Sequence, residues 1–232
     1  IGCNALTELV SMAKKKNRTE SEAALITLRD LFCKDLLPPV TRPLRYFFEH
    51  NNSNTGKVND RQLVGWLIED RVRRSLSEYV SALEVASSDS AVPHHKDIAI
   101  GCVRELLQSG RLSSSSSQEQ MHLVSLLVNK LGDLKRQLCG QIIKWLGEMV
   151  VNGHISKSIV VEEVERFLYR RNVSRRAQYY AIVFLSSIVL TRKEHELASK
   201  LVTIYLSFFR ASVAPPEKHD STTSSLAQLG TG

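Results

Sequence analysis

Apolar residues recur at intervals of three and four along most of the chain, which is the period of an amphipathic α-helix. Between residues 160 and 210 the pattern forms three apolar stripes separated by two short turns, and it predicts three consecutive helices. The same spacing predicts earlier helices over about 6–13, 20–37, 60–84, 94–109, 118–131 and 134–151. These elements together predict an all-α fold.

The stripes also predict which side chains form the core. In the C-terminal half we expect seven buried residues: Phe167, Leu168, Ala181, Phe184, Leu185, Leu201 and Tyr205. Along the helix predicted over 60–84, the apolar side comprises Leu63, Trp66, Leu67, Leu76, Tyr79, Val80 and Leu83.

Neighbouring helices are joined by short connections, so we expect them to pack as antiparallel pairs. One pair begins near Gln118 and the next near Ser156, a step of about 38 residues that approximates the repeat of HEAT and armadillo solenoids. We therefore predict an open array of stacked helix pairs over residues 1–213, with an irregular helical bundle as the alternative. Residues 109–117, SGRLSSSSS, are a candidate flexible joint, and residues 214–232 are expected to be a disordered tail or a partial continuation.

Composition supports an all-helical fold, because glycine and proline are unfavourable inside helices and the chain of 232 residues has only 11 glycines and 6 prolines.

The net charge is +7, and it is unevenly distributed. Residues 1–110 carry 15 basic and 14 acidic side chains, whereas residues 111–210 carry 15 basic and 8 acidic ones. An excess of positive charge in one half of a domain indicates nucleic acid or another polyanion as a partner. A basic surface without a partner is the alternative.

The densest positive charge lies in the arginine turn, RRNVSRR, residues 170–176. Arg170 and Arg171 are expected to end one helix, where the helix dipole favours cations. Arg175 and Arg176 should begin the next helix after the N-cap Ser174, where the dipole opposes them. A phosphate bound at that N-terminus would make the position of the two arginines favourable, because its negative charge attracts both the guanidinium groups and the free helix N–H groups. The alternative is an internal ion pair with one of the acids Glu162, Glu163 and Glu165 on the preceding helix.

A second basic cluster, the lysine turn, comprises Lys14, Lys15, Lys16 and Arg18. It follows the first predicted helix, where cations suit the C-terminal dipole, so the cluster has an adequate structural explanation. The same side chains are also candidates for contact with phosphate.

Motifs for catalysis are absent from the sequence, which has no glycine-rich phosphate loop, HExxH or GxSxG. His94 and His95 are adjacent, but no third residue is spaced to complete a metal site. Four separated cysteines without a CxxC are typical of reduced buried thiols. We therefore expect no enzyme activity, no cofactor and no metal, and no apolar run is long enough to span a membrane.

The region 161–210 reads VEEVERFLYRRNVSRRAQYYAIVFLSSIVL, followed by ELASKLVTIYLSFFR. This motif resembles the signature region of the CCAAT-binding factor family of nucleolar ribosome-assembly proteins, in its nucleolar complex protein 1 branch. Further segments occur in the order that this branch shows: AKKK at 13–16, LRDLFCKDLLP at 28–38, RQLVGWLIEDRV at 61–72 and VNKLGD at 128–133. The resemblance covers about residues 6–213. The chain departs from the family in the divergent stretch directly after VNKLGD and again beyond residue 213.

This resemblance implies a non-catalytic armadillo-type scaffold in the nucleolus. It implies contact with precursor ribosomal RNA, a heterodimer with a nucleolar complex protein 2 homologue, and further contacts with large-subunit assembly factors and ribosomal proteins. The alternative function is a protein-only helical adaptor, of transcription or transport type, whose basic patch binds acidic partners.

Overall fold

The computed structural model describes residues 2–15, 17–37, 44–51, 59–88, 92–112 and 118–213. The chain divides into two compact units, Ile1–Thr191 and Arg192–Gly232. Every described element is helical, which confirms the predicted all-α class. Residues 113–117 of the predicted joint and the predicted tail at 214–232 lie outside the described residues.

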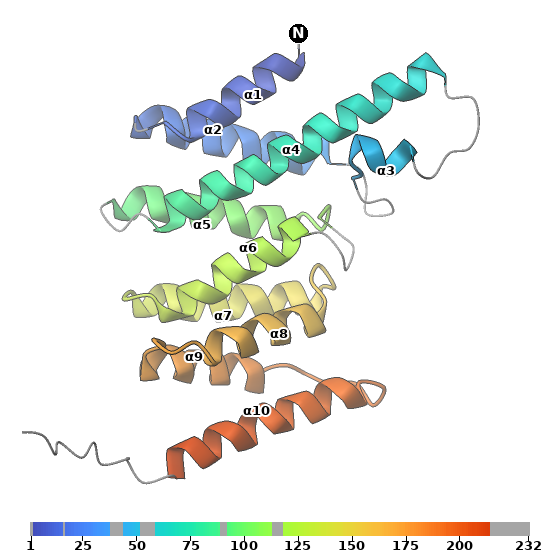
Figure 1. Cartoon of the computed structure of the whole chain (residues 1–232). Coiled ribbons are helices and arrows are strands. Elements are labelled where there is room, and N and C mark those ends of the chain that lie inside the picture. The colour runs from blue at the N-terminus through green and yellow to red at the C-terminus, as the bar shows by residue number, and fades with distance from the viewer. Residues whose placement is uncertain are drawn as a thin grey trace, which may run out of the picture. The chain divides into compact units, whose positions relative to one another are not determined.

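The first unit contains most of the elements (Figure 1). They are α1 (Gly2–Ala13), α2 (Arg18–Leu31) with a π-helical continuation (Phe32–Leu36), α3 (Phe47–Asn51), α4 (Asp60–Ser88), α5 (Pro93–Gln108), α6 (Gln118–Asn129), a 3-10 turn (Lys130–Gly132), α7 (Arg136–Val151), α8 (Lys157–Leu168) and α9 (Arg175–Ser186). The described part of the second unit is α10 (His195–Val213).

The helices of the first unit stack in two layers (Figure 1). One layer contains α1, α4, α6 and α8, because α4 packs on α1 and α6, and α6 packs on α8. The other contains α2, α5, α7 and α9, with contacts between each successive pair. This is the arrangement of a helical-repeat solenoid, and the last two pairs begin at Gln118 and Lys157, close to the predicted step.

The interior of the first two pairs centres on Tyr79 of α4, whose side chain is fully buried. Its ring stacks on Phe32 with centroids 5.5 Å apart, and its hydroxyl donates a hydrogen bond of 2.8 Å to the carbonyl of Leu25 in α2. Burial raises the pKa of Tyr79 well above its ordinary value, so the hydroxyl remains a donor across the physiological range. The contact joins the two layers through both packing and hydrogen bonding.

Most of the predicted core is confirmed in the C-terminal half. Phe167, Leu168, Ala181, Phe184 and Leu185 are all buried.

The second unit gives a mixed result for the two predicted core residues of α10. Leu201 is buried, whereas Tyr205 is only partly buried.

The prediction for α4 is right over its C-terminal half and wrong over its N-terminal half. Leu76, Val80 and Leu83 are buried, but Leu63 is 38% exposed and Leu67 is 54% exposed. Figure 1 shows the reason, because the first turns of α4 extend past the neighbouring helices of the stack. There α4 contacts the short α3, where Trp66 stacks on His50 with ring centroids 5.0 Å apart.

Asp133, in the turn before α7, connects three helix pairs. Its carboxylate forms an ion pair with Lys96 of α5, in which both side chains are largely buried. Its backbone carbonyl accepts a hydrogen bond of 2.7 Å from the Arg176 guanidinium of α9. In the same turn, Lys130 donates to the carbonyl of Ser87 at the end of α4, at 2.7 Å. The segment VNKLGD therefore joins α4, α5 and α9 through polar contacts.

Burial alone would raise the pKa of Asp133, but the Lys96 ammonium, the amide of Lys135 and the charge of Lys130 hold it below its ordinary value of 3.8. A carboxylate with a depressed pKa in the folded state stabilises the fold above its unfolded pKa. That contribution is lost as the pH falls through the depressed folded pKa. The stabilising effect of Asp133 is therefore present at neutral pH and disappears in acid below about pH 4.

We expect Asp133→Asn to lower the free energy of unfolding at pH 7 by about 2–4 kcal/mol, because it leaves Lys96 largely buried without a counter-ion. The measurement is urea denaturation from pH 7 down to pH 3. The difference in free energy of unfolding between wild type and the variant should become smaller as the pH falls to 3. Asp97→Asn is the control, because Asp97 pairs with Lys135 at the surface and should contribute less than about 1 kcal/mol. Equal stability of the two variants at pH 7 would contradict the assigned role of Asp133.

Phe184→Ala should lower the free energy of unfolding by about 3–5 kcal/mol, because the ring of Phe184 is fully buried in α9. Tyr179→Ala changes an aromatic residue on the same helix that is 65% exposed, and it should stay within about 0.5 kcal/mol of wild type. Thermal and urea denaturation of both variants measure the difference. A Phe184→Ala protein with the wild-type denaturation midpoint would show that the wrong face of α9 has been placed inward.

Candidate nucleic-acid interface

The arginine turn connects α8 to α9. Ser174 is the N-cap of α9, as predicted, and its side chain accepts a hydrogen bond of 3.2 Å from the amide of Ala177. Arg175 and Arg176 are the first two residues of α9, where the helix dipole opposes positive charge. Arg170 and Arg171 lie just beyond the last residue of α8, Leu168. The four arginines are therefore on one connection but in two different local environments.

Two of these arginines make contacts within the fold. Arg176 is bound to the carbonyl of Asp133, which gives it a structural role that the sequence did not indicate. Arg170 donates to the side-chain carbonyl of Asn129 at 2.6 Å, and its guanidinium lies 3.6 Å from the carboxylate of Glu163. The predicted alternative of an ion pair to α8 is thus made by Arg170 and, at 2.7 Å, by Arg166, rather than by Arg175 or Arg176.

The other two arginines are exposed. Within the described parts of the chain, the side chains of Arg171 and Arg175 have no hydrogen bond and no ion pair. Both guanidinium groups are therefore available to a ligand. Arg175 begins α9, and no acidic residue lies in the first turn of that helix. A guanidinium beside unpaired helix N–H groups is an arrangement that suits a phosphate.

The lysine turn connects α1 to α2 at the other end of the stack of helix pairs. Lys14 forms an ion pair of 2.8 Å with Glu78 of α4, and Lys15 lies 3.7 Å from Glu20. All four side chains are about half exposed, so these pairs contribute little to stability and can exchange partners. Arg18 is the first residue of α2, whereas Lys16 lies outside the described residues.

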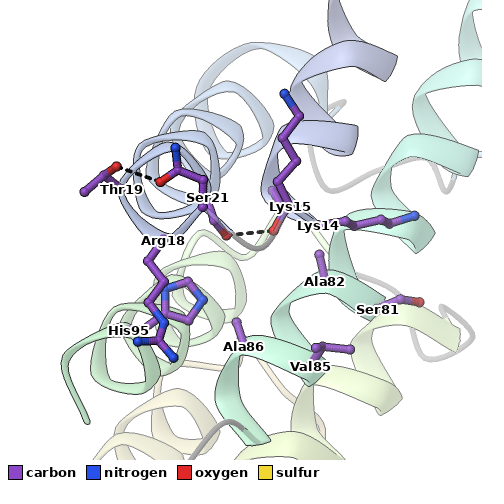
Figure 2. Close-up of a pocket in the computed structure, with 12 residues that line it drawn as sticks. Lys14, Lys15, Arg18, Thr19, Ser21, Ser81, Ala82, Val85, Ala86 and His95 are labelled. Carbon is purple, nitrogen blue, oxygen red and sulfur yellow. Dashed lines mark hydrogen bonds between the residues drawn. The ribbon is translucent and has the colours of Figure 1, made fainter. Parts of the chain in front are cut away.

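A groove of about 830 Å³ lies beside the lysine turn (Figure 2). Its rim carries Lys14, Lys15 and Arg18, and its lining comes from the α1–α2 connection, the C-terminal half of α4 and the first turn of α5. The α4 side is formed by small or aliphatic residues, whereas the α5 side is formed by the His95 ring. The groove thus combines positive charge at its opening with a mostly uncharged interior.

The two basic turns share one edge of the stack. In Figure 1 the helices α1, α4, α6 and α8 end at the left edge, and α2, α5, α7 and α9 begin there. In an antiparallel pair the second helix begins where the first helix ends, so the connections within all four pairs lie on the same edge. The turns belong to the first and last pairs of the first unit, so they are separated by the two pairs between them.

Two further cations on the same edge were not predicted as site residues. Lys135 is the N-cap of α7 and Arg136 is its first residue, and both are exposed. Arg136 has no ion pair or hydrogen bond among the described residues, whereas Lys135 pairs with Asp97 at 3.0 Å. The signal was present in the sequence, since Lys135-Arg136 follows a predicted turn that antiparallel pairing brings to this edge.

We call the exposed cations of these three connections the cationic edge: Lys14, Lys15, Arg18, Lys135, Arg136, Arg170, Arg171 and Arg175.

Over the described ranges, no cluster of three or more His, Cys, Asp or Glu side chains could hold a metal ion. Burial raises the pKa of the Cys102 thiol to about 11, so Cys102 stays protonated and unreactive at neutral pH. None of the helices in the described ranges is both long enough and apolar enough to cross a membrane.

Comparison with known proteins finds relatives over nearly the whole chain, although no family model matches it. CCAAT/enhancer-binding protein zeta is 35% identical in human and 34% identical in mouse, each over 97% of this chain. Ribosome biogenesis protein NOC1 of Chaetomium thermophilum is 31% identical over 89% of the chain, and nucleolar complex protein 1 of Drosophila melanogaster is 26% identical over 90%. The chain spans only about a fifth of the length of these relatives: 21% of the human, mouse and Chaetomium proteins and 18% of the Drosophila protein.

The matches extend well beyond the signature region at 161–210, since each of them covers 89% or more of the chain. Identity at this level over nearly the whole chain, on an all-helical repeat scaffold, shows that the chain belongs to the CCAAT-binding factor family, in its nucleolar complex protein 1 branch.

Proposed function

We propose that this chain is a non-catalytic scaffold of ribosome biogenesis that acts in the nucleolus and binds precursor ribosomal RNA through its cationic edge. The names of two relatives, ribosome biogenesis protein NOC1 and nucleolar complex protein 1, support the nucleolar role in ribosome assembly. The observation that carries the RNA-binding part is the alignment of exposed cations from three helix connections along one edge of the stack.

The geometry favours a backbone-contacting mode of binding. Three of the four helix-pair connections of the first unit, those of the first, third and fourth pairs, carry exposed cations on the same edge of the stack. Side chains that reach phosphates neutralise charge and release counter-ions, and they do so without regard to base sequence. Arg171, Arg175 and Arg136 have no competing acid partner among the described residues, so an incoming phosphate displaces only water and ions from them.

Protein partners complete the proposed scaffold. A helical-repeat stack offers two long faces in addition to its edges, and such faces commonly bind other proteins. We propose a nucleolar complex protein 2 homologue as the heterodimeric partner, together with large-subunit assembly factors and ribosomal proteins. Affinity purification of the full-length protein should recover both this partner and precursor ribosomal RNA. Recovery of proteins alone after RNA-preserving lysis would favour the protein-only adaptor.

Replacing Arg171 and Arg175 together by Gln should weaken RNA binding and leave the melting temperature unchanged, because both side chains are exposed and neither has a hydrogen bond or an ion pair with the rest of the described fold. The loss of two phosphate contacts should reduce the slope of log affinity against log salt by about two units, equally for different RNA sequences. Fluorescence anisotropy with labelled duplex and stem–loop RNAs, from 50 to 300 mM salt, measures both quantities.

The matched control replaces Arg170 and Arg176 by Gln, which removes the same charge from the same turn. These two arginines contact Asn129, Glu163 and Asp133, so this variant should lose thermal stability. An unchanged affinity and salt slope in the Arg171 and Arg175 variant would mean that the arginine turn is a solvated structural feature. Binding of an acidic peptide but no RNA would support the adaptor instead.

A further inference from the structure

The N-terminal half of α4 carries a contiguous apolar surface that the neighbouring helices of the stack leave exposed. Val64, Leu67 and Ile68 are 56%, 54% and 49% exposed, although side chains of these types are usually buried. Together with Arg71 they follow the spacing i, i+3, i+4 and i+7, which places all four residues on one face of the helix. We call these four residues the α4 face.

The short helix α3 lies against the neighbouring side of α4 and does not bury this face. Phe47 contacts Trp66 edge to face, with ring centroids 6.3 Å apart, and the amide of Phe47 donates to the Asp70 carboxylate at 3.2 Å. His50 stacks on the same Trp66 ring. Trp66 and Asp70 are one helical turn apart on the side that α3 occupies, so the apolar residues of the α4 face remain accessible to a ligand.

The length of α4 explains why its first half lacks a neighbour. The 29 residues of α4 extend about 43 Å, whereas its neighbours in the layer, α1 and α6, have 12 residues each and extend about 18 Å. Figure 1 shows the first turns of α4 reaching beyond both neighbours. Residues 60–71 therefore offer about 18 Å of helix surface, which a partner helix of about three turns would cover.

Positive charge borders the α4 face. Arg61 and Arg71 are exposed, and within the described ranges neither side chain has a hydrogen bond or an ion pair. The nearby acids Glu69 and Asp70 are largely buried and form ion pairs inside the fold. Asp60 is exposed, but it lies in the first turn of α4, where the helix dipole favours an acid. The surface around the apolar residues is therefore complementary to a partner with negative charge.

The chemistry of the α4 face indicates a protein ligand. Contiguous exposed apolar side chains mark protein-binding surfaces, and burial of apolar area gives no advantage to a polyanion such as RNA. A symmetric dimer would place the same patch of two copies face to face and would bring their Arg71 side chains together. A different protein that supplies acids avoids this repulsion.

We propose that the α4 face binds one amphipathic helix of a different protein. The apolar stripe of that helix packs on Val64, Leu67 and Ile68, and acidic residues beside the stripe pair with Arg61 and Arg71. This surface adds a protein-binding site to the proposed scaffold, and it does not depend on RNA binding by the cationic edge.

The test uses the full-length protein in cells, with a photoreactive benzophenone amino acid in place of Val64. Mass spectrometry of the crosslinked product should identify one partner segment with apolar residues at helical spacing and with Asp or Glu beside them. The same photoreactive group in place of Val85 is the control, because Val85 is 73% exposed in the C-terminal half of α4 and should not capture that segment.

Affinities of the crosslinked segment, prepared as a synthetic peptide, measure which side chains bind it. Leu67→Glu should weaken binding by about tenfold or more, because it places a charge in the apolar contact. Val85→Glu adds the same charge to an exposed position on the same helix and should keep the wild-type affinity. Both variants should keep the wild-type melting temperature. Replacing Arg61 and Arg71 together by Gln should weaken binding by about 2- to 30-fold and reduce its salt dependence.

Several outcomes would overturn the proposal: no crosslink from position 64, a crosslink to RNA or to a second copy of the chain, or a partner segment without acidic residues. Equal affinity of the Leu67→Glu and Val85→Glu proteins would overturn it as well. The variant with Gln at Arg171 and Arg175 should keep the crosslink even where it loses RNA. Failure of the α4 face and failure of the cationic edge are therefore recognised separately.

Discussion

The ion pair between Asp133 and Lys96 is the contact on which the order of the helix pairs depends most directly. The helix pairs otherwise pack mainly through buried apolar side chains, and this attraction is non-directional. A largely buried carboxylate with an ammonium partner is directional, because a shift of either helix leaves a charge unpaired. Asp133 also binds Arg176 through its carbonyl, so the same residue holds α9 against the turn before α7.

This constraint decides which cations remain available to a ligand. Arg176 and Lys96 bind Asp133, Lys130 binds the end of α4, and Arg170 partly neutralises the buried Glu163. Exposed cations also lie within helices, such as Arg71 in α4 and Lys144 in α7, but eight of them gather at three helix connections on one side of the stack. This gathering underlies the proposal of an RNA-binding scaffold.

The cationic edge also has an electrostatic character that follows from helix direction. Four helices begin at this edge and four end there, so the dipoles of the whole stack largely cancel. The electrostatic potential at the edge is then set by the groups close to each helix end. The first turns of α5, α7 and α9 have no acidic residue, although acids are the usual choice at a helix N-terminus. The positive potential at this edge therefore comes from side chains, and it should weaken steeply with added salt.

The sequence by itself determined the helices, the N-cap Ser174 and most core positions, because these depend on spacing within one helix. It also located the arginine and lysine turns. Only the tertiary structure decided that Leu63 and Leu67 are exposed, since an apolar stripe is buried only where a neighbouring helix covers it. Only the tertiary structure separated Arg176 from Arg175, because the partner of Arg176 lies 43 residues earlier in the chain. The groove likewise forms from three helices that are distant in sequence, and local periodicity carries no information about such a contact.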